Sequence, residues 1–97
     1  MSELQVVATI PAKPEAADQV REALLTLAVA TREEEGCLAY DLFESASTPG
    51  TFVTVERWTD SASLDAHMAT PHVAAAFGAA EGALSGEVAI HPLQPVG

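Results

Sequence analysis

Two of the three histidines and the only tryptophan of this 97-residue chain fall within one short segment. The segment spans residues 56–72 and contains Trp58, His67 and His72. An imidazole takes up and releases a proton close to neutral pH, so either histidine is a candidate general base. Local structure could turn the two imidazoles and the indole toward one place, and we expect any chemistry of the chain to lie there.

The elements predicted around this segment explain how it would position these side chains. Apolar residues predict a strand over residues 51–58, which ends at the tryptophan. Asp60 is a suitable N-cap for a short helix whose apolar stripe includes His67. A Thr-Pro pair begins the next helix and places His72 in its first turn, where the positive end of the helix dipole favours a neutral imidazole.

The order of all predicted elements sets the fold class. Strands are predicted at residues 4–10, 38–43, 51–58 and 88–93. A long helix is predicted over residues 15–35, with Gly36 as a left-handed C-cap. The resulting order, β-α-β-β-α-β, is the ferredoxin-like arrangement of the α+β class, in which helices cover one face of a four-stranded antiparallel sheet. We expect one domain over residues 1–97, with 95–97 as a short tail.

Charge and cysteine content exclude several classes of function. The net charge of −10, with only four basic residues, argues against binding to nucleic acid or to anionic membranes. The single cysteine, Cys37, excludes an internal disulfide, and its place after a helix end does not favour a nucleophilic thiolate. No stretch reaches the roughly 18 apolar residues of a membrane span, and the N-terminus lacks a signal-peptide pattern. We therefore expect a cytoplasmic protein.

The predicted third strand has apolar residues on both faces. Phe52 and Trp58 share one face, while Val53 and Val55 lie on the other. Helices on one side can bury only one face of the sheet. A chain this short also has a small core, so we expect a second copy to cover the free face and form a homodimer.

Several short motifs together resemble one known family. They are Glu34-Glu35-Gly36-Cys37 followed by Tyr40, then Val55-Glu56-Arg57-Trp58, then His67 and Thr70-Pro71-His72. Their order and spacing are similar to the antibiotic biosynthesis monooxygenase (ABM) family, nearest to its small bacterial quinol monooxygenases. The resemblance implies a dimeric α+β barrel, in which two ferredoxin-like protomers pack their sheets together. It also implies a pocket between sheet and helices, and oxidation of a quinol or related phenol by O2 without metal, flavin or haem cofactors.

The chemistry that the resemblance implies assigns roles to individual residues. Cofactor-free oxidation needs a base that removes a phenolic proton, and we expect His67 or His72 to be that base. An apolar pocket would hold the small aromatic substrate and keep water from the reactive intermediate. The expected pocket residues are Tyr40, Phe52, Thr54, Glu56, Trp58, Leu64, Met68 and Phe77. No candidate ligands have the spacing of a metal site, so none is predicted.

Two other classes of function stay open on the sequence. One is a non-redox isomerase of a small carbonyl compound, and a phosphorylated substrate would then need Arg21 or Arg57 in the pocket. The other is a non-catalytic dimeric module that binds a small molecule. Of the remaining polar residues, the run Glu33–Glu35 is expected to be a solvated helix end, and His91 could face either side of its strand.

Overall fold

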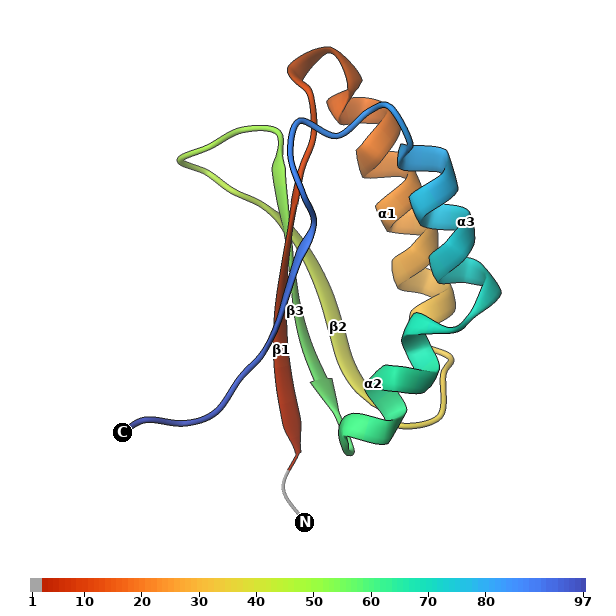
Figure 1. Ribbon diagram of the computed structural model, residues 1–97, viewed down its shortest axis with the longest axis vertical. Coiled ribbons are helices and arrows are strands. Elements are labelled where there is room, and N and C mark those ends of the chain that lie inside the picture. Colours follow the sequence, from red (N-terminus) through yellow and green to blue (C-terminus); the bar gives the residue numbers. More distant parts are fainter. Residues whose placement is uncertain (1–2) are drawn as a thin grey trace.

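The computed structural model describes residues 3–97. It contains an antiparallel sheet with helices on one face only (Figure 1). Its strands are β1 (Leu4–Pro11), β2 (Cys37–Glu44), β3 (Thr51–Trp58) and β4 (Ala89–Pro92). They lie in the order β2-β3-β1-β4, and every pairing is antiparallel. The predicted ferredoxin-like α+β fold with a four-stranded sheet is therefore confirmed.

A short 3-10 helix, η1 (Pro14–Ala16), is followed by the helices α1 (Ala17–Thr31), α2 (Ser61–Met68) and α3 (Pro71–Ala80). Helices α1 and α3 pack side by side over the sheet, and the shorter α2 lies near one end of the pair (Figure 1). The Asp60 carboxylate caps α2 by accepting a hydrogen bond from the Ser63 N–H at 2.9 Å, as predicted. The Thr70 hydroxyl caps α3 in the same way through the Val73 N–H. None of the helices in the described part of the chain is long and apolar enough to cross a membrane.

The end of α1 differs from the prediction. The sequence predicts a helix as far as residue 35, but α1 ends at Thr31 and tight turns follow. In these turns the Glu34 N–H donates to the Thr31 carbonyl, and the Cys37 N–H donates to the Glu34 carbonyl. Gly36 does have the expected left-handed conformation, with φ of +91°, but it closes the turns and not the helix. Glu34 is thereby released from the helix surface.

The inner face of the sheet forms the core together with the helices. Alternate residues of β3 from Phe52 to Trp58 are all buried on this face, as the two-residue period predicts. Across the ladder, Thr54 pairs with Ala8 and Glu56 pairs with Val6. The large side chains at the two ends of β3 thus flank smaller residues in its middle.

The outer face of the sheet carries no helix, and Figure 1 shows it bare. Phe43 on β2 and Val55 on β3 are 54% and 43% exposed there. His91 on β4 pairs with Val7, whose side chain points to the same outer face, so His91 lies on the opposite side of the sheet from the helices.

Candidate active site

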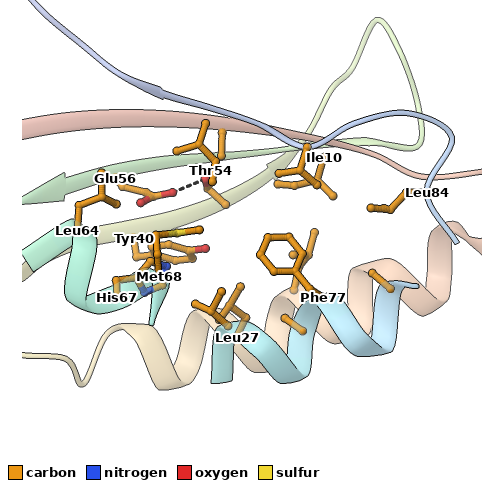
Figure 2. A pocket seen from close by; sticks show the side chains of 17 residues that line it. Ile10, Leu27, Tyr40, Thr54, Glu56, Leu64, His67, Met68, Phe77 and Leu84 are labelled. Carbon is orange, nitrogen blue, oxygen red and sulfur yellow. Dashed lines mark hydrogen bonds between the residues drawn. The ribbon is translucent and has the colours of Figure 1, made fainter. Parts of the chain in front are cut away.

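An apolar cavity lies between the inner face of the sheet and the helices (Figure 2). Six of the predicted pocket residues line it: Tyr40, Thr54, Glu56, Leu64, Met68 and Phe77. Aliphatic residues complete the walls, including Ile10, Leu24, Leu27, Val73, Val88 and Ile90. Met68, Phe77 and Ile90 remain partly exposed and form the rim through which the cavity meets solvent.

Two predicted pocket residues, Phe52 and Trp58, do not line the cavity. Both are fully buried at opposite ends of β3, where their bulk fills the space between sheet and helices. The cavity lies over the middle of the strand, beside Thr54 and its small partner Ala8. Trp58 still contacts the site from behind, because its ring lies 4.9 Å from that of His67.

His67 is the histidine that lines the cavity. It is buried on α2, and its ring also lies 5.8 Å from that of Tyr40. Its Nδ1 is 2.7 Å from Oε2 of Glu34. A carboxylate oxygen accepts hydrogen bonds, so Nδ1 carries a proton and donates it. In the neutral ring this leaves Nε2, on the other side of the imidazole, as a proton acceptor.

His72 lies outside the cavity. It borders a separate hollow between α1 and α3, together with Ala23 and Ala79 among others. Its Nε2 is nevertheless 2.6 Å from the same Glu34 oxygen, and its ring is 6.1 Å from that of His67. The expectation that Trp58, His67 and His72 all border one cavity is therefore wrong: the three side chains gather, but only His67 faces the cavity.

Glu34 is the site residue that the sequence analysis missed. It was expected at a solvated helix end, but its side chain is only 13% exposed and lies between the two imidazoles. This position is possible because α1 stops at Thr31 and the Gly36 turn brings the chain back. A signal was present in the sequence, since consecutive carboxylates at a helix C-terminus oppose the helix dipole.

Glu56 places a buried carboxylate in the cavity wall. It accepts hydrogen bonds from the Thr54 hydroxyl at 2.6 Å and from the Trp58 indole N–H at 2.9 Å (Figure 2 draws the first of these). The hydroxyl proton of Thr54 is thus already engaged by a neighbouring residue. Burial raises the pKa of the nearby Tyr40 phenol, and the Glu56 carboxylate raises it further, so Tyr40 is neutral at physiological pH.

No lysine or arginine side chain lines the cavity, although all four of these residues lie in the described part of the chain. Arg57 pairs with Glu3, with contacts of 2.8 and 3.0 Å. Arg21 pairs with Asp18 and with Glu44, the latter at 2.8 Å. An anionic substrate would therefore lose its hydration in this cavity without gaining a cationic partner.

Comparison with known proteins agrees with this fold and shows the family. Residues 4–79 match the model of a family described as antibiotic biosynthesis monooxygenase (ABM). The chain belongs to the ABM family. Among curated proteins, it is 38% identical over 71 residues to Rv0793 of Mycobacterium tuberculosis, covering 73% of this chain and 69% of Rv0793. It is also 38% identical over 65 residues to YcnE of Bacillus subtilis, covering 67% and 68% of the two chains.

Several solved structures superimpose over nearly the whole chain. The Rv0793 structure has a TM-score of 0.88 and 33% identity, covering 99% of this chain and 97% of that one. The structure of PA3566 from Pseudomonas aeruginosa has a TM-score of 0.90 and 32% identity, covering 100% and 97%. A structure described as an antibiotic biosynthesis monooxygenase has a TM-score of 0.89 and 37% identity, covering 97% and 99%.

Proposed function

We propose that this ABM protein is a cofactor-independent monooxygenase that oxidises a quinol or a related phenol with O2. Membership of the family supports oxygenation, and Rv0793 and YcnE are both provisionally named monooxygenases. The observation that carries the proposal is the place of His67, a buried imidazole in the wall of an apolar cavity whose Nδ1 is held by a carboxylate.

The proposed reaction begins with a proton transfer. Nε2 of His67 takes the proton of a phenolic hydroxyl, and the electron-rich phenolate gives one electron to O2. The phenoxyl radical and superoxide then combine, which forms a carbon–oxygen bond to the ring. The His67 imidazolium returns its proton to this peroxide to give a hydroperoxide.

Loss of water completes the reaction. The ring carbon that carries the hydroperoxide loses its hydrogen as a proton, the oxygen–oxygen bond breaks, and the distal oxygen leaves as water. A carbonyl remains on the ring, so a quinol becomes a hydroxyquinone. One atom of O2 enters the product and the other becomes water. The quinol supplies all the electrons, and no further reductant is needed.

Two carboxylates support this chemistry in different ways. Glu34 holds the tautomer of His67 that presents a proton acceptor to the cavity, and it stabilises the imidazolium that forms. Glu56 accepts two hydrogen bonds and has further lone pairs, so it can accept one from the second hydroxyl of a quinol. The apolar walls hold the ring and exclude water from the peroxide.

Charge in the cavity weighs against one alternative reaction. An isomerase acting on a phosphorylated compound would need Arg21 or Arg57 near the substrate, but both pair with carboxylates outside the cavity wall. The O2-uptake experiment described next distinguishes an enzyme from a non-catalytic binding module.

The test measures O2 uptake by chelator-treated protein with hydroquinones of increasing size. His67→Gln should lower turnover roughly 10²–10⁴-fold, because the general base is removed. His91→Gln removes an imidazole on the opposite side of the sheet and should leave the rate unchanged. If His67→Gln oxidises the quinol as fast as the native protein, only autoxidation is being observed. The protein would then be a binding module.

The proposal includes a homodimer in which the outer faces of two sheets pack together. Its support is the apolar outer face with Phe43 and Val55, which no helix covers in the described residues. Each protomer would retain its own cavity, since the cavity opens between the sheet and the helices on the other side.

A further inference from the structure

We propose that Glu34, His67 and His72 form a binding site for a divalent transition-metal ion such as Zn²⁺. One potential ligand atom from each residue lies within 4.8 Å of the other two. The atoms are Oε2 of Glu34, Nδ1 of His67 and Nε2 of His72. Two imidazoles and one carboxylate are a ligand set that suits first-row divalent ions.

Three separate parts of the chain supply these ligands. Glu34 comes from the turn after α1, His67 from the last turn of α2, and His72 from the first turn of α3. Their side chains are 13%, 5% and 27% exposed, so the ligands are largely buried while the His72 side remains open to solvent. Three protein ligands leave a position for water, as in metal sites that are not fully closed.

The two separations from Glu34 to the histidines require only a small adjustment on binding, and the two imidazoles must come to a similar separation from within 4.8 Å. Zn–N and Zn–O bonds are about 2.0–2.2 Å, which separates two ligands of a tetrahedral ion by roughly 3.3–3.5 Å. The present contacts of 2.7 and 2.6 Å are those of N–H donors to one carboxylate oxygen. The carboxylate of Glu34 must therefore withdraw by several tenths of an ångström as the ion takes the place of the two shared protons. Its flexible side chain in a turn can make that movement.

The charge of the molecule favours occupancy by a cation. The chain has 14 acidic and four basic residues, and its net charge of −10 raises the local concentration of cations. The pairing of Arg57 with Glu3 and of Arg21 with Glu44 leaves neither guanidinium on the Glu34 carboxylate. An incoming ion therefore does not compete with either arginine for the Glu34 carboxylate.

The ion would lie behind His67 and not in the cavity, because neither Glu34 nor His72 lines the cavity. A neutral imidazole that binds metal through Nδ1 carries its remaining proton on Nε2. The bound ion would therefore remove the proton acceptor that His67 presents to substrate. This inhibitory consequence rests on the proposed function, whereas the binding itself does not.

The test titrates Zn²⁺ into the 97-residue chain after dialysis against a chelator, in competition with a chromophoric chelator. The native protein should bind one Zn²⁺ per chain. Glu34→Gln and His72→Gln should each weaken binding at least tenfold, because each removes a ligand. Glu35→Gln is the matched control, since it makes the same chemical change as Glu34→Gln at an exposed position outside the cluster, and it should bind as the native protein does.

Two further measurements distinguish loss of the metal site from a folding defect, and binding at the site from binding to the surface. Zn²⁺ should raise the Tm of the native protein but not that of Glu34→Gln, whose cooperative unfolding without metal shows that it is folded. Paramagnetic Co²⁺ should quench Trp58, the only tryptophan, because its ring is 4.9 Å from that of His67.

Some outcomes would overturn the site. Absence of saturable binding up to millimolar Zn²⁺ is one, and equal affinity of the native, Glu34→Gln and His72→Gln proteins is another. Equal affinity would mean that ions bind only to the acidic surface. Because binding is measured without substrate, its failure leaves the proposed oxidation standing. Conversely, an inactive protein that binds Zn²⁺ through these ligands would refute the oxidation alone.

Discussion

At the scale of single residues, one oxygen of Glu34 decides where the protons of two imidazoles lie. Each ring must present an N–H to this acceptor, so His67 and His72 both donate to it. The arrangement joins a residue in the cavity wall to a residue that reaches solvent, through a carboxylate that lines neither the cavity nor the hollow at His72. Glu34 is thus a positioning residue, and the two histidines have different surroundings although they are five positions apart.

Tyr40 offers a direct test of the electrostatics of the cavity, since it is the only tyrosine of the chain. Burial and then the Glu56 carboxylate raise the pKa of its phenol above the usual value of 10.0. In a spectrophotometric titration the phenolate should therefore be absent at pH 10 and appear only at higher pH. The same titration in denaturant should give a pKa of about 10.

The sign of this shift sets the effect on stability. The folded protein holds the Tyr40 proton more tightly than the unfolded chain does. The corresponding stability is complete below the unfolded pKa and is lost as the pH rises toward the folded pKa. A phenolate that forms in the folded protein at its ordinary pKa would mean that Tyr40 is not buried beside Glu56.

Sequence reasoning placed residues on the correct faces but could not determine which of them line the cavity. The two-residue period of β3 correctly puts Phe52, Thr54 and Trp58 on one face. Whether such a residue borders a cavity or fills the core depends on the helix packed above it, which no local pattern encodes. The contact from Glu34 to His67 spans 33 positions and was beyond reach for the same reason.

At the scale of elements, Gly36 determines how the turn after α1 meets the start of α2. A methyl group at this position would lie 2.7 Å from Cβ of Ser63 and would contact the Ser63 hydroxyl even more closely. The Gly36 carbonyl also accepts a hydrogen bond from the Thr59 N–H at 2.9 Å. The turn therefore fixes both Glu34, two residues earlier, and the helix that carries His67.

Replacing two glycines by alanine should separate this role from general effects of the substitution. Gly36→Ala should destabilise the protein by at least roughly 1–3 kcal/mol, because a non-glycine residue is strained at φ of +91° before the clash is counted. Gly78→Ala, within α3, meets no atom within 4 Å and should stabilise by about 0.5–1 kcal/mol. Urea unfolding followed by Trp58 fluorescence measures both. Equal effects of the two changes would contradict the assigned role of Gly36.

Local signals predicted most of the element boundaries. The bounds of β3 agree with the prediction at both ends, and the caps at Asp60 and Thr70 begin α2 and α3. The end of α1 was wrong because apolar periodicity and the position of Gly36 suit either a longer helix or a helix followed by turns. Tertiary contacts of Glu34 with α2 and α3 favour the second arrangement.

At the scale of the whole molecule, the bare outer face of the sheet predicts self-association. Sedimentation at micromolar concentration should give a dimer of the 10.1 kDa chain, with an interface on the order of 1,200–2,000 Å². Val55→Asp on the outer face should shift the protein toward monomer, because it would bury an unpaired carboxylate. Val29→Asp, on an exposed side of α1, is the matched control and should leave the dimer intact. A native monomer at these concentrations would refute the proposed assembly.

The short edge strand β4 also determines how the cavity can open transiently. It pairs with β1 through four residues, whereas β1 and β3 pair through eight, and the cavity wall includes its Ile90 together with Val88. Segments with few ladder contacts open at the lowest free energy, so amide hydrogens of β4 should exchange with solvent before those of β1 and β3. The wall facing solvent is therefore the one that thermal fluctuations move aside most readily. The rate at which a bulky ring reaches His67 would then depend on the anchoring of this strand and not on the imidazole.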